Sequence, residues 1–203
     1  MSQDLLISSS PHERDRDSIE RIMWSVVIAL TPAVAASVYF FGLRALALYA
    51  VSVATAEAAE LICLKARQRP LRRAFDGSAA VTGMLTAMIL PPSSPWYVVL
   101  VASGFAVAIV KHCFGGLGHN LWNPALAGRI FVQFAYPAEV SLSKWTVPRL
   151  LYETPSVSAD ATTQATPLFQ EAGGYPDYLD LFTGNGISGS LGETCKLALL
   201  IGG

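Results

Sequence analysis

Hydroxyl side chains are concentrated in one polar stretch of a chain that is otherwise rich in apolar residues. The stretch runs from Asp160 to Leu168 and reads DATTQATPL. A threonine hydroxyl is a weak nucleophile unless a general base lies beside it, and neither a base nor a metal-ligand spacing accompanies this run. The residue types alone therefore predict a solvated loop and assign no chemistry to any single threonine.

Two carboxylates lie near the end of a long apolar segment. Glu57 and Glu60 are three residues apart, so they share one face of a helix. A carboxylate inside a membrane span is a functional hypothesis by default, and here it would serve a path for a cation. The alternative is that both residues lie at the membrane interface and pair with the basic cluster from Lys65 to Arg73. Their position within two turns of the helix end favours this pairing.

A glycine-rich segment, Gly115-Gly116-Leu117-Gly118, resembles a phosphate-binding loop only superficially. No GKS or GKT sequence follows it and no strand precedes it. The glycines allow close packing and leave backbone groups free, which Asn120 and Asn123 could hydrogen-bond. A purely structural break and a break that lines a cofactor or ion site remain equally open.

Cysteine and histidine spacing excludes a disulfide framework and a zinc enzyme. The cysteines are odd in number and far apart, and the histidines have no HxxxH or HExxH spacing. These residues are Cys63, Cys113, Cys195, His12, His112 and His119. The cysteines are best interpreted as small buried hydrophobic residues.

The composition is that of a membrane protein. Apolar residues make up 52% of the chain, charged residues only 14%, and the mean hydropathy is +0.43. The net charge of −1 offers no basic excess, so no nucleic-acid partner is expected.

Apolar runs place the membrane region at residues 22–136, after an N-terminal segment of residues 1–21. We expect about four spans, at 22–41, 45–64, 79–90 and 96–110, followed by a broken or re-entrant segment at 114–130. Basic residues before the first span and after the second predict that both of these segments are cytoplasmic. If the broken segment completes a crossing, the polar loop at 137–188 is extracytoplasmic.

The sequence Gly-Ser-x-x-x-Thr occurs twice, at 77–82 and 189–194, each time before an apolar run. Entry of the second copy from the opposite side would give an inverted repeat with a site near the midplane. Residues 189–203 would then begin a further transmembrane helix, and the chain would be the first half of a longer protein. The predicted fold is all-α, multi-pass and transmembrane, with a broken segment and a long extracytoplasmic loop.

The order of several motifs resembles the D subunit of the Rnf electron transport complex, a relative of the B subunit of the sodium-translocating NADH:quinone reductase. The motifs that carry the resemblance are SPHERDRDSIERIM, DGSAAVTGMLTAMILPPSSPWY, KHCFGGLGHNLWNPALAGR, DATTQATPL and SGSLGETCKLALLIGG. They cover essentially the whole chain.

The resemblance implies FMN bound covalently through a phosphoester to a threonine. The family's attachment motif falls on Asp160, Thr163, Ala165 and Thr166, with Thr166 as the flavin-bearing residue. A separate flavin transferase would attach the FMN, which leaves the isoalloxazine ring free for redox work. Two positions differ, since Ala161 and Gln164 stand where the family usually has glycine. The resemblance also leaves room for a second, non-covalent flavin.

The resemblance further implies one stage of electron transfer between ferredoxin and NAD, coupled to movement of Na⁺ or H⁺. The partners would be the other membrane, iron–sulfur and flavin subunits of the complex in a bacterial inner membrane. The N-terminus would be cytoplasmic and the flavin loop periplasmic. Two alternatives stay open, a non-redox solute or ion transport protein and a structural membrane subunit that lacks flavin.

Overall fold

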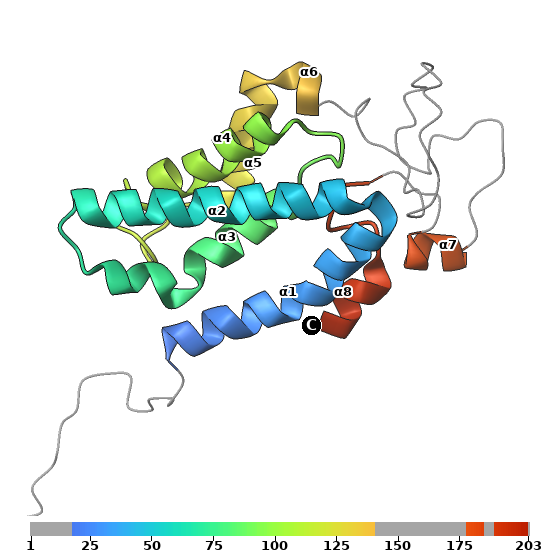
Figure 1. Ribbon diagram of the computed structural model, residues 1–203, viewed down its shortest axis with the longest axis horizontal. Coiled ribbons are helices and arrows are strands. Elements are labelled where there is room, and N and C mark those ends of the chain that lie inside the picture. The colour runs from blue at the N-terminus through green and yellow to red at the C-terminus, as the bar shows by residue number, and fades with distance from the viewer. Residues whose placement is uncertain (1–17, 141–177, 185–188, 203) are drawn as a thin grey trace, which may run out of the picture.

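All regular structure in the described part of the chain is helical (Figure 1). The computed structural model describes residues 18–140, 178–184 and 189–202. Predictions that concern residues 1–17, 141–177, 185–188 and 203 lie outside the described residues. The elements are α1 (Ile19–Phe41), α2 (Leu43–Ala66), η1 (Leu71–Asp76), α3 (Ser78–Met88), α4 (Trp96–Phe105), η2 (Ala106–Lys111), α5 (Pro124–Ala135), α6 (Pro137–Val140), α7 (Tyr178–Thr183) and α8 (Lys196–Gly202).

Helices α1 and α2 form an antiparallel pair joined by a single glycine. Ser18 caps the start of α1, because its side chain accepts a hydrogen bond from the backbone N–H of Arg21. Gly42 makes the turn with φ of +73°, a backbone conformation that favours glycine. Helices of 23 and 24 residues are about 35 Å long, which is enough to cross a hydrocarbon core of about 30 Å. Within the described residues, only these two helices have spanning length and composition.

The third and fourth predicted spans form helices close to the expected residues, and both helices are shorter than a hydrocarbon core of about 30 Å. Helix α3 has 11 residues and is about 16 Å long, and the continuous segment of α4 and η2 reaches about 24 Å. Pro91, Pro92 and Pro95 separate the two helices, since a proline cannot donate a backbone hydrogen bond and disfavours helix in the residue before it.

The predicted broken segment divides into a loop and a helix. Gly115, Gly116 and Gly118 all have positive φ, so the chain from Cys113 to Asn123 is irregular. Helix α5 then begins at Pro124, where the Asn123 side chain accepts a hydrogen bond from the backbone N–H of Ala125.

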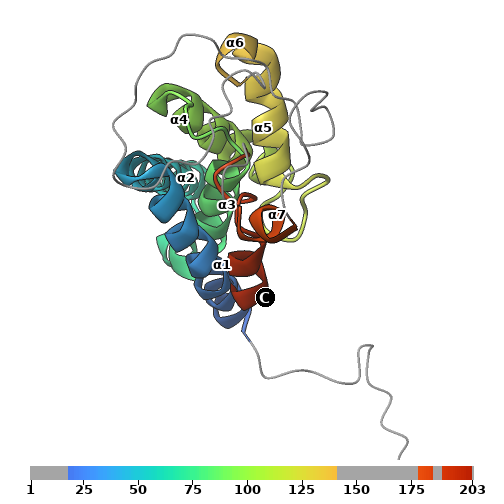
Figure 2. The same ribbon diagram turned by 90° about the vertical axis from the view of Figure 1, so that its right-hand side faces the viewer.

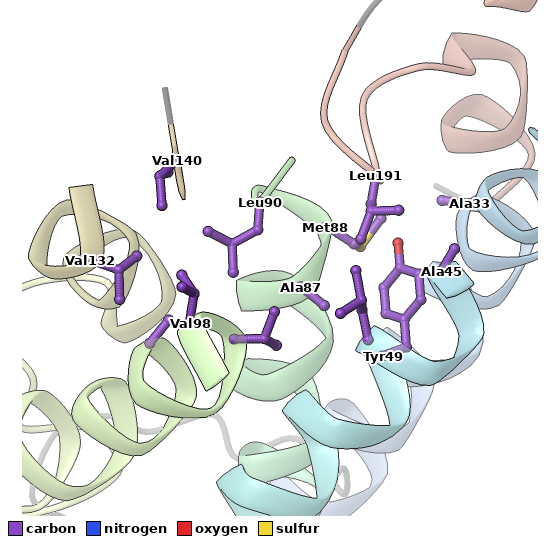
Figure 3. Close-up of a cluster of buried hydrophobic side chains, with 13 residues drawn as sticks. Ala33, Ala45, Tyr49, Ala87, Met88, Leu90, Val98, Val132, Val140 and Leu191 are labelled. Carbon is purple, nitrogen blue, oxygen red and sulfur yellow. The ribbon is translucent and has the colours of Figure 1, made fainter. Parts of the chain in front are cut away.

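One hydrophobic cluster joins the helices at the end of the bundle where α3 stops (Figure 3). It includes Tyr49 of α2, Leu90 after α3, Val98 of α4, Val132 of α5 and Leu191. Elsewhere the helices approach closely through small and hydroxyl residues. In one such contact, Ser52 donates a hydrogen bond to the carbonyl of Gly83 at 2.6 Å. Packing through small residues, with many large apolar side chains exposed outside, is typical of helices in lipid.

The segment that carries the second Gly-Ser-x-x-x-Thr sequence is tied to the end of α3. The backbone N–H of Leu191 donates to the carbonyl of Leu90 at 3.2 Å, and that of Gly192 donates to the carbonyl of Met88 at 2.8 Å. Ser37 of α1 also donates to the carbonyl of Leu191. The following helix α8 lies beside α1, as Figures 1 and 2 both show.

The two copies of the repeated sequence have matching local structure. Thr82 donates to the carbonyl of Ser78 at 2.9 Å, and Thr194 donates to the carbonyl of Ser190 at 2.7 Å. All four residues are buried. The first copy lies near the start of α1, because Gly77 approaches Met23, whereas the second lies near Ser37 at the other end of α1.

A glycine-to-alanine pair tests the close packing of α4 against α5. A Cβ at Gly128 would lie 2.5 Å from the backbone oxygen of Ala102, whereas one at Gly104 would meet only Thr55 at 3.8 Å. We expect Gly128→Ala to lower stability by about 1–3 kcal/mol. Gly104→Ala should be neutral or stabilising by up to about 1 kcal/mol, because alanine favours helix. Thermal unfolding of the full-length protein measures both, and equal stability of the two variants would contradict this packing.

Candidate functional site

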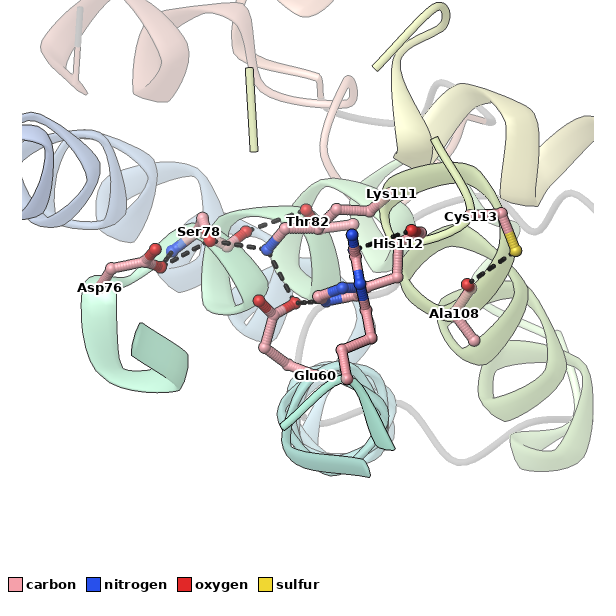
Figure 4. Close-up of polar contacts among 9 residues, drawn as sticks. Glu60, Asp76, Ser78, Thr82, Ala108, Lys111, His112 and Cys113 are labelled. Atoms are coloured by element: carbon pink, nitrogen blue, oxygen red, sulfur yellow. Dashed lines mark hydrogen bonds and ion pairs between the residues drawn. The ribbon is translucent and has the colours of Figure 1, made fainter. Parts of the chain in front are cut away.

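A cluster of charged and polar side chains is buried at the end of the bundle where α3 begins (Figure 4). It consists of Glu60 from α2, Asp76 and Ser78 around the start of α3, and Lys111 and His112 at the end of η2. We call it the Lys111 cluster. Lys111 is 1% exposed, Glu60 4% and His112 7%.

Glu60 is the anion at the centre of the cluster. Its Oε2 lies 2.8 Å from Lys111 Nζ and 2.9 Å from His112 Nε2. Both are ion-pair distances, although Oε2 and Nε2 lack the alignment of regular hydrogen bonds. Lys111 also donates to Ser78 Oγ at 2.7 Å.

Ser78 carries the polar contacts from Lys111 to Asp76. The Ser78 hydroxyl donates to Asp76 Oδ1 at 2.5 Å, and the Ser78 backbone N–H donates to the same oxygen at 2.8 Å. Asp76 is half-buried, so the contacts run from the enclosed Glu60 to a carboxylate that water reaches in part. The buried ammonium thus lies between one carboxylate in direct contact and a second one a hydroxyl away.

The π-helical turn η2 determines how Lys111 and His112 are presented. The backbone N–H of His112 donates to the carbonyl of Val107 at 3.0 Å, five residues back, which is the wide spacing of a π turn. Two consecutive side chains can therefore both reach the carboxylate of Glu60 on α2. Arg67 secures this end of η2, since its Nη1 donates to the carbonyl of His112 at 3.1 Å.

The two carboxylates that the sequence placed together have different partners in the structure. The sequence predicted that Glu60 pairs with the basic residues at 65–73. In the structure its partners are Lys111 and His112, so the predicted partner is wrong. The partners come from 51 and 52 positions further along the chain, where no helical spacing points to them. Glu57 is half-buried beside the backbone N–H of Ala80.

Three further predictions, about a metal site, a helix cap and the flavin attachment motif, can be compared with the structure. Among the described residues, no three His, Cys, Asp or Glu side chains lie close enough to share a metal ion. Glu193 accepts a hydrogen bond from the backbone N–H of Ser190 at 3.0 Å, as expected for a capping box. The attachment motif of Asp160, Thr163, Ala165 and Thr166 lies outside the described residues.

Comparison with known proteins places the chain in a family. Residues 6–203 match the NQR2, RnfD, RnfE family. The chain belongs to this family. It is 46% identical over 205 residues to the D subunit of the Na(+)-translocating ferredoxin:NAD(+) oxidoreductase complex of Acetobacterium woodii, covering 98% of this chain and 61% of that protein.

Two other members of the family align with this chain over similar shares of their length. The chain is 39% identical to the D subunit of the proton-translocating ferredoxin:NAD(+) oxidoreductase complex of Clostridium ljungdahlii, covering 97% of this chain and 60% of the relative. It is 37% identical to the D subunit of the ion-translocating oxidoreductase complex of Rhodobacter capsulatus, covering 96% and 61%. The chain therefore spans about three-fifths of the length of these relatives.

Substitution of Lys111 tests the energetic role of the cluster. We expect Lys111→Met to lower the stability of the full-length protein by about 3 kcal/mol or more, because it leaves a buried carboxylate without its ammonium. Glu60→Leu combined with Lys111→Met should cost less than the sum of the single changes, since no uncompensated charge remains.

The matched control is Lys196→Met, at an exposed position, which should change stability by no more than about 0.5 kcal/mol. Chemical or thermal unfolding of the variants gives the coupling between Glu60 and Lys111. Strict additivity of the two single changes would contradict the ion pair.

Proposed function

We propose that this chain is the flavin-bearing membrane part of a D subunit in an ion-translocating ferredoxin:NAD oxidoreductase complex. The observation that carries the proposal is the 46% identity to a subunit of that name over 98% of the chain. The all-helical structure with two helices of spanning length is consistent with a subunit in a membrane. The other subunits of the complex would be its partners and would bind ferredoxin and NAD.

Thr166 is the residue that we propose to carry FMN. The support is the sequence pattern of Asp160, Thr163, Ala165 and Thr166, which matches the attachment motif of the family. Attachment forms a phosphoester between the threonine oxygen and the FMN phosphate, and a flavin transferase would catalyse it. When bound, the flavin would accept and release electrons. The threonine itself acts only as the point of attachment, which explains why no general base accompanies it.

The orientation in the membrane follows from charge. The exposed basic residues between Lys65 and Arg73 lie beside the start of α1, because Trp24 donates to the carbonyl of Phe75 at 3.4 Å. By the positive-inside rule, these residues support a cytoplasmic location for this end of the bundle. The loop at 137–188 would then be extracytoplasmic, in a bacterial inner membrane.

The matched local structure of residues 77–82 and 189–194 supports an inverted repeat. The two copies begin near opposite ends of α1, and the second is hydrogen-bonded to the carbonyl end of α3. Half-length helices that meet inside a bundle are how transporters build midplane sites. This arrangement favours a second candidate function, non-redox transport of a solute or ion, which bound flavin would exclude.

Covalent flavin is tested on the full-length protein co-expressed with the transferase. We expect the denatured protein to give a fluorescent band in a gel and Thr166→Val to abolish it. Thr162→Val changes a neighbouring threonine outside the motif and should keep the fluorescence. Gln164→Gly, which introduces the residue that the family usually has, should give at least as much flavin as the unchanged protein.

A dark band from the unchanged protein would remove the flavin proposal, provided that the transferase modifies another substrate in the same cells. Measurement of solute flux in vesicles would then distinguish a transport protein from a structural subunit.

A further inference from the structure

Four basic side chains at one end of the bundle have no role in the Lys111 cluster. Lys65, Arg69, Arg72 and Arg73 are exposed, and none of their side chains makes a hydrogen bond or ion pair within the described ranges. Arg67, in the same run, differs because it donates to the carbonyl of His112. We call these four residues the basic patch. Four exposed cations within nine residues of sequence, none of them paired within the described part of the chain, make this surface attractive to an anionic partner.

Large apolar side chains are exposed beside the basic patch. Leu71 is 48% exposed and Phe75 67%, and both belong to the short helix η1. Trp24, 47% exposed, joins them from α1, because its Nε1 donates to the carbonyl of Phe75. The same surface therefore offers cations and apolar groups together. A partner that is only acidic would leave the apolar groups in water.

The position of η1 relates this surface to the membrane. Figure 1 shows η1 directly after α2, at the end of the bundle where α1 begins. Since α1 and α2 are the two helices of spanning length, their ends lie near the level at which a bilayer changes from hydrocarbon to headgroups. Aromatic side chains favour this level, and lysine and arginine reach headgroup phosphates from it.

We propose that the basic patch, together with Leu71, Phe75 and Trp24, binds the headgroup of an anionic phospholipid. The cations pair with the phosphate and any further anionic group, and the apolar side chains contact the upper part of the acyl chains. Basic clusters directly next to the cytoplasmic end of a membrane helix are a recurring mode of anionic-lipid recognition. This site is separate from Thr166, so its test does not depend on the flavin.

Native mass spectrometry of the full-length protein tests the proposal with phosphatidylglycerol and with phosphatidylcholine of the same acyl chains. We expect tighter binding of phosphatidylglycerol. Arg72→Gln combined with Arg73→Gln should weaken this binding by about tenfold or more and leave phosphatidylcholine unchanged. Arg72→Lys combined with Arg73→Lys keeps the charge and should retain most of the preference.

The control is Lys196→Gln, which removes one exposed charge on α8 and should leave lipid binding unchanged. Equal affinity for the two lipids in the unchanged protein would overturn the proposal, as would a preference that survives the double glutamine change. Loss of another subunit from the purified complex in the double glutamine variant, with unchanged lipid preference, would assign the patch to a protein partner instead.

Discussion

A buried ammonium requires a buried anion, and in this chain that requirement determines how the helices meet. Lys111 is 1% exposed and pairs with Glu60, which is 4% exposed. An uncompensated charge in such surroundings would cost several kcal/mol, so the end of η2 has to lie where α2 presents its carboxylate. Ser78 accepts a further hydrogen bond from Lys111, which brings the start of α3 to the same place. One cation thus positions three elements that are distant in sequence.

The opposite end of the bundle is held by different forces. There the side chains of Leu90, Val98, Val132 and Leu191 pack against one another. Most of the hydrogen bonds at this end are formed by backbone groups. Helix α3 ends inside the bundle, where its last carbonyls need partners that neither water nor lipid supplies in such a place. The N–H groups of Leu191 and Gly192 provide two of them, and Arg129 donates to the carbonyl of Ile89. The end of the short helix is therefore completed by segments from much later in the chain.

The sequence predicts well what depends on local composition. The first two spans follow from long apolar runs, in which Glu57 and Glu60 are the only charged residues, and the start of α5 follows from Asn123 and Pro124. The pairing of Glu60 was predicted with the wrong partner, because the basic run at 65–73 is near in sequence whereas Lys111 is near only in the folded chain. The π turn that presents Lys111 and His112 together has no sequence signal. Thr166 is a different case, since no physical rule selects one threonine from that run and only the family motif does.

The two ends of the long loop bear on what the subunit can do. The loop begins close to Val140 and ends shortly before Leu191. Both residues belong to the hydrophobic cluster that contains Leu90, at the carbonyl end of α3. The loop that carries Thr166 is therefore joined to the bundle, on both sides, at the end where α3 stops and not at the Lys111 cluster. Helix α3, about 16 Å long, runs from one of these ends to the other.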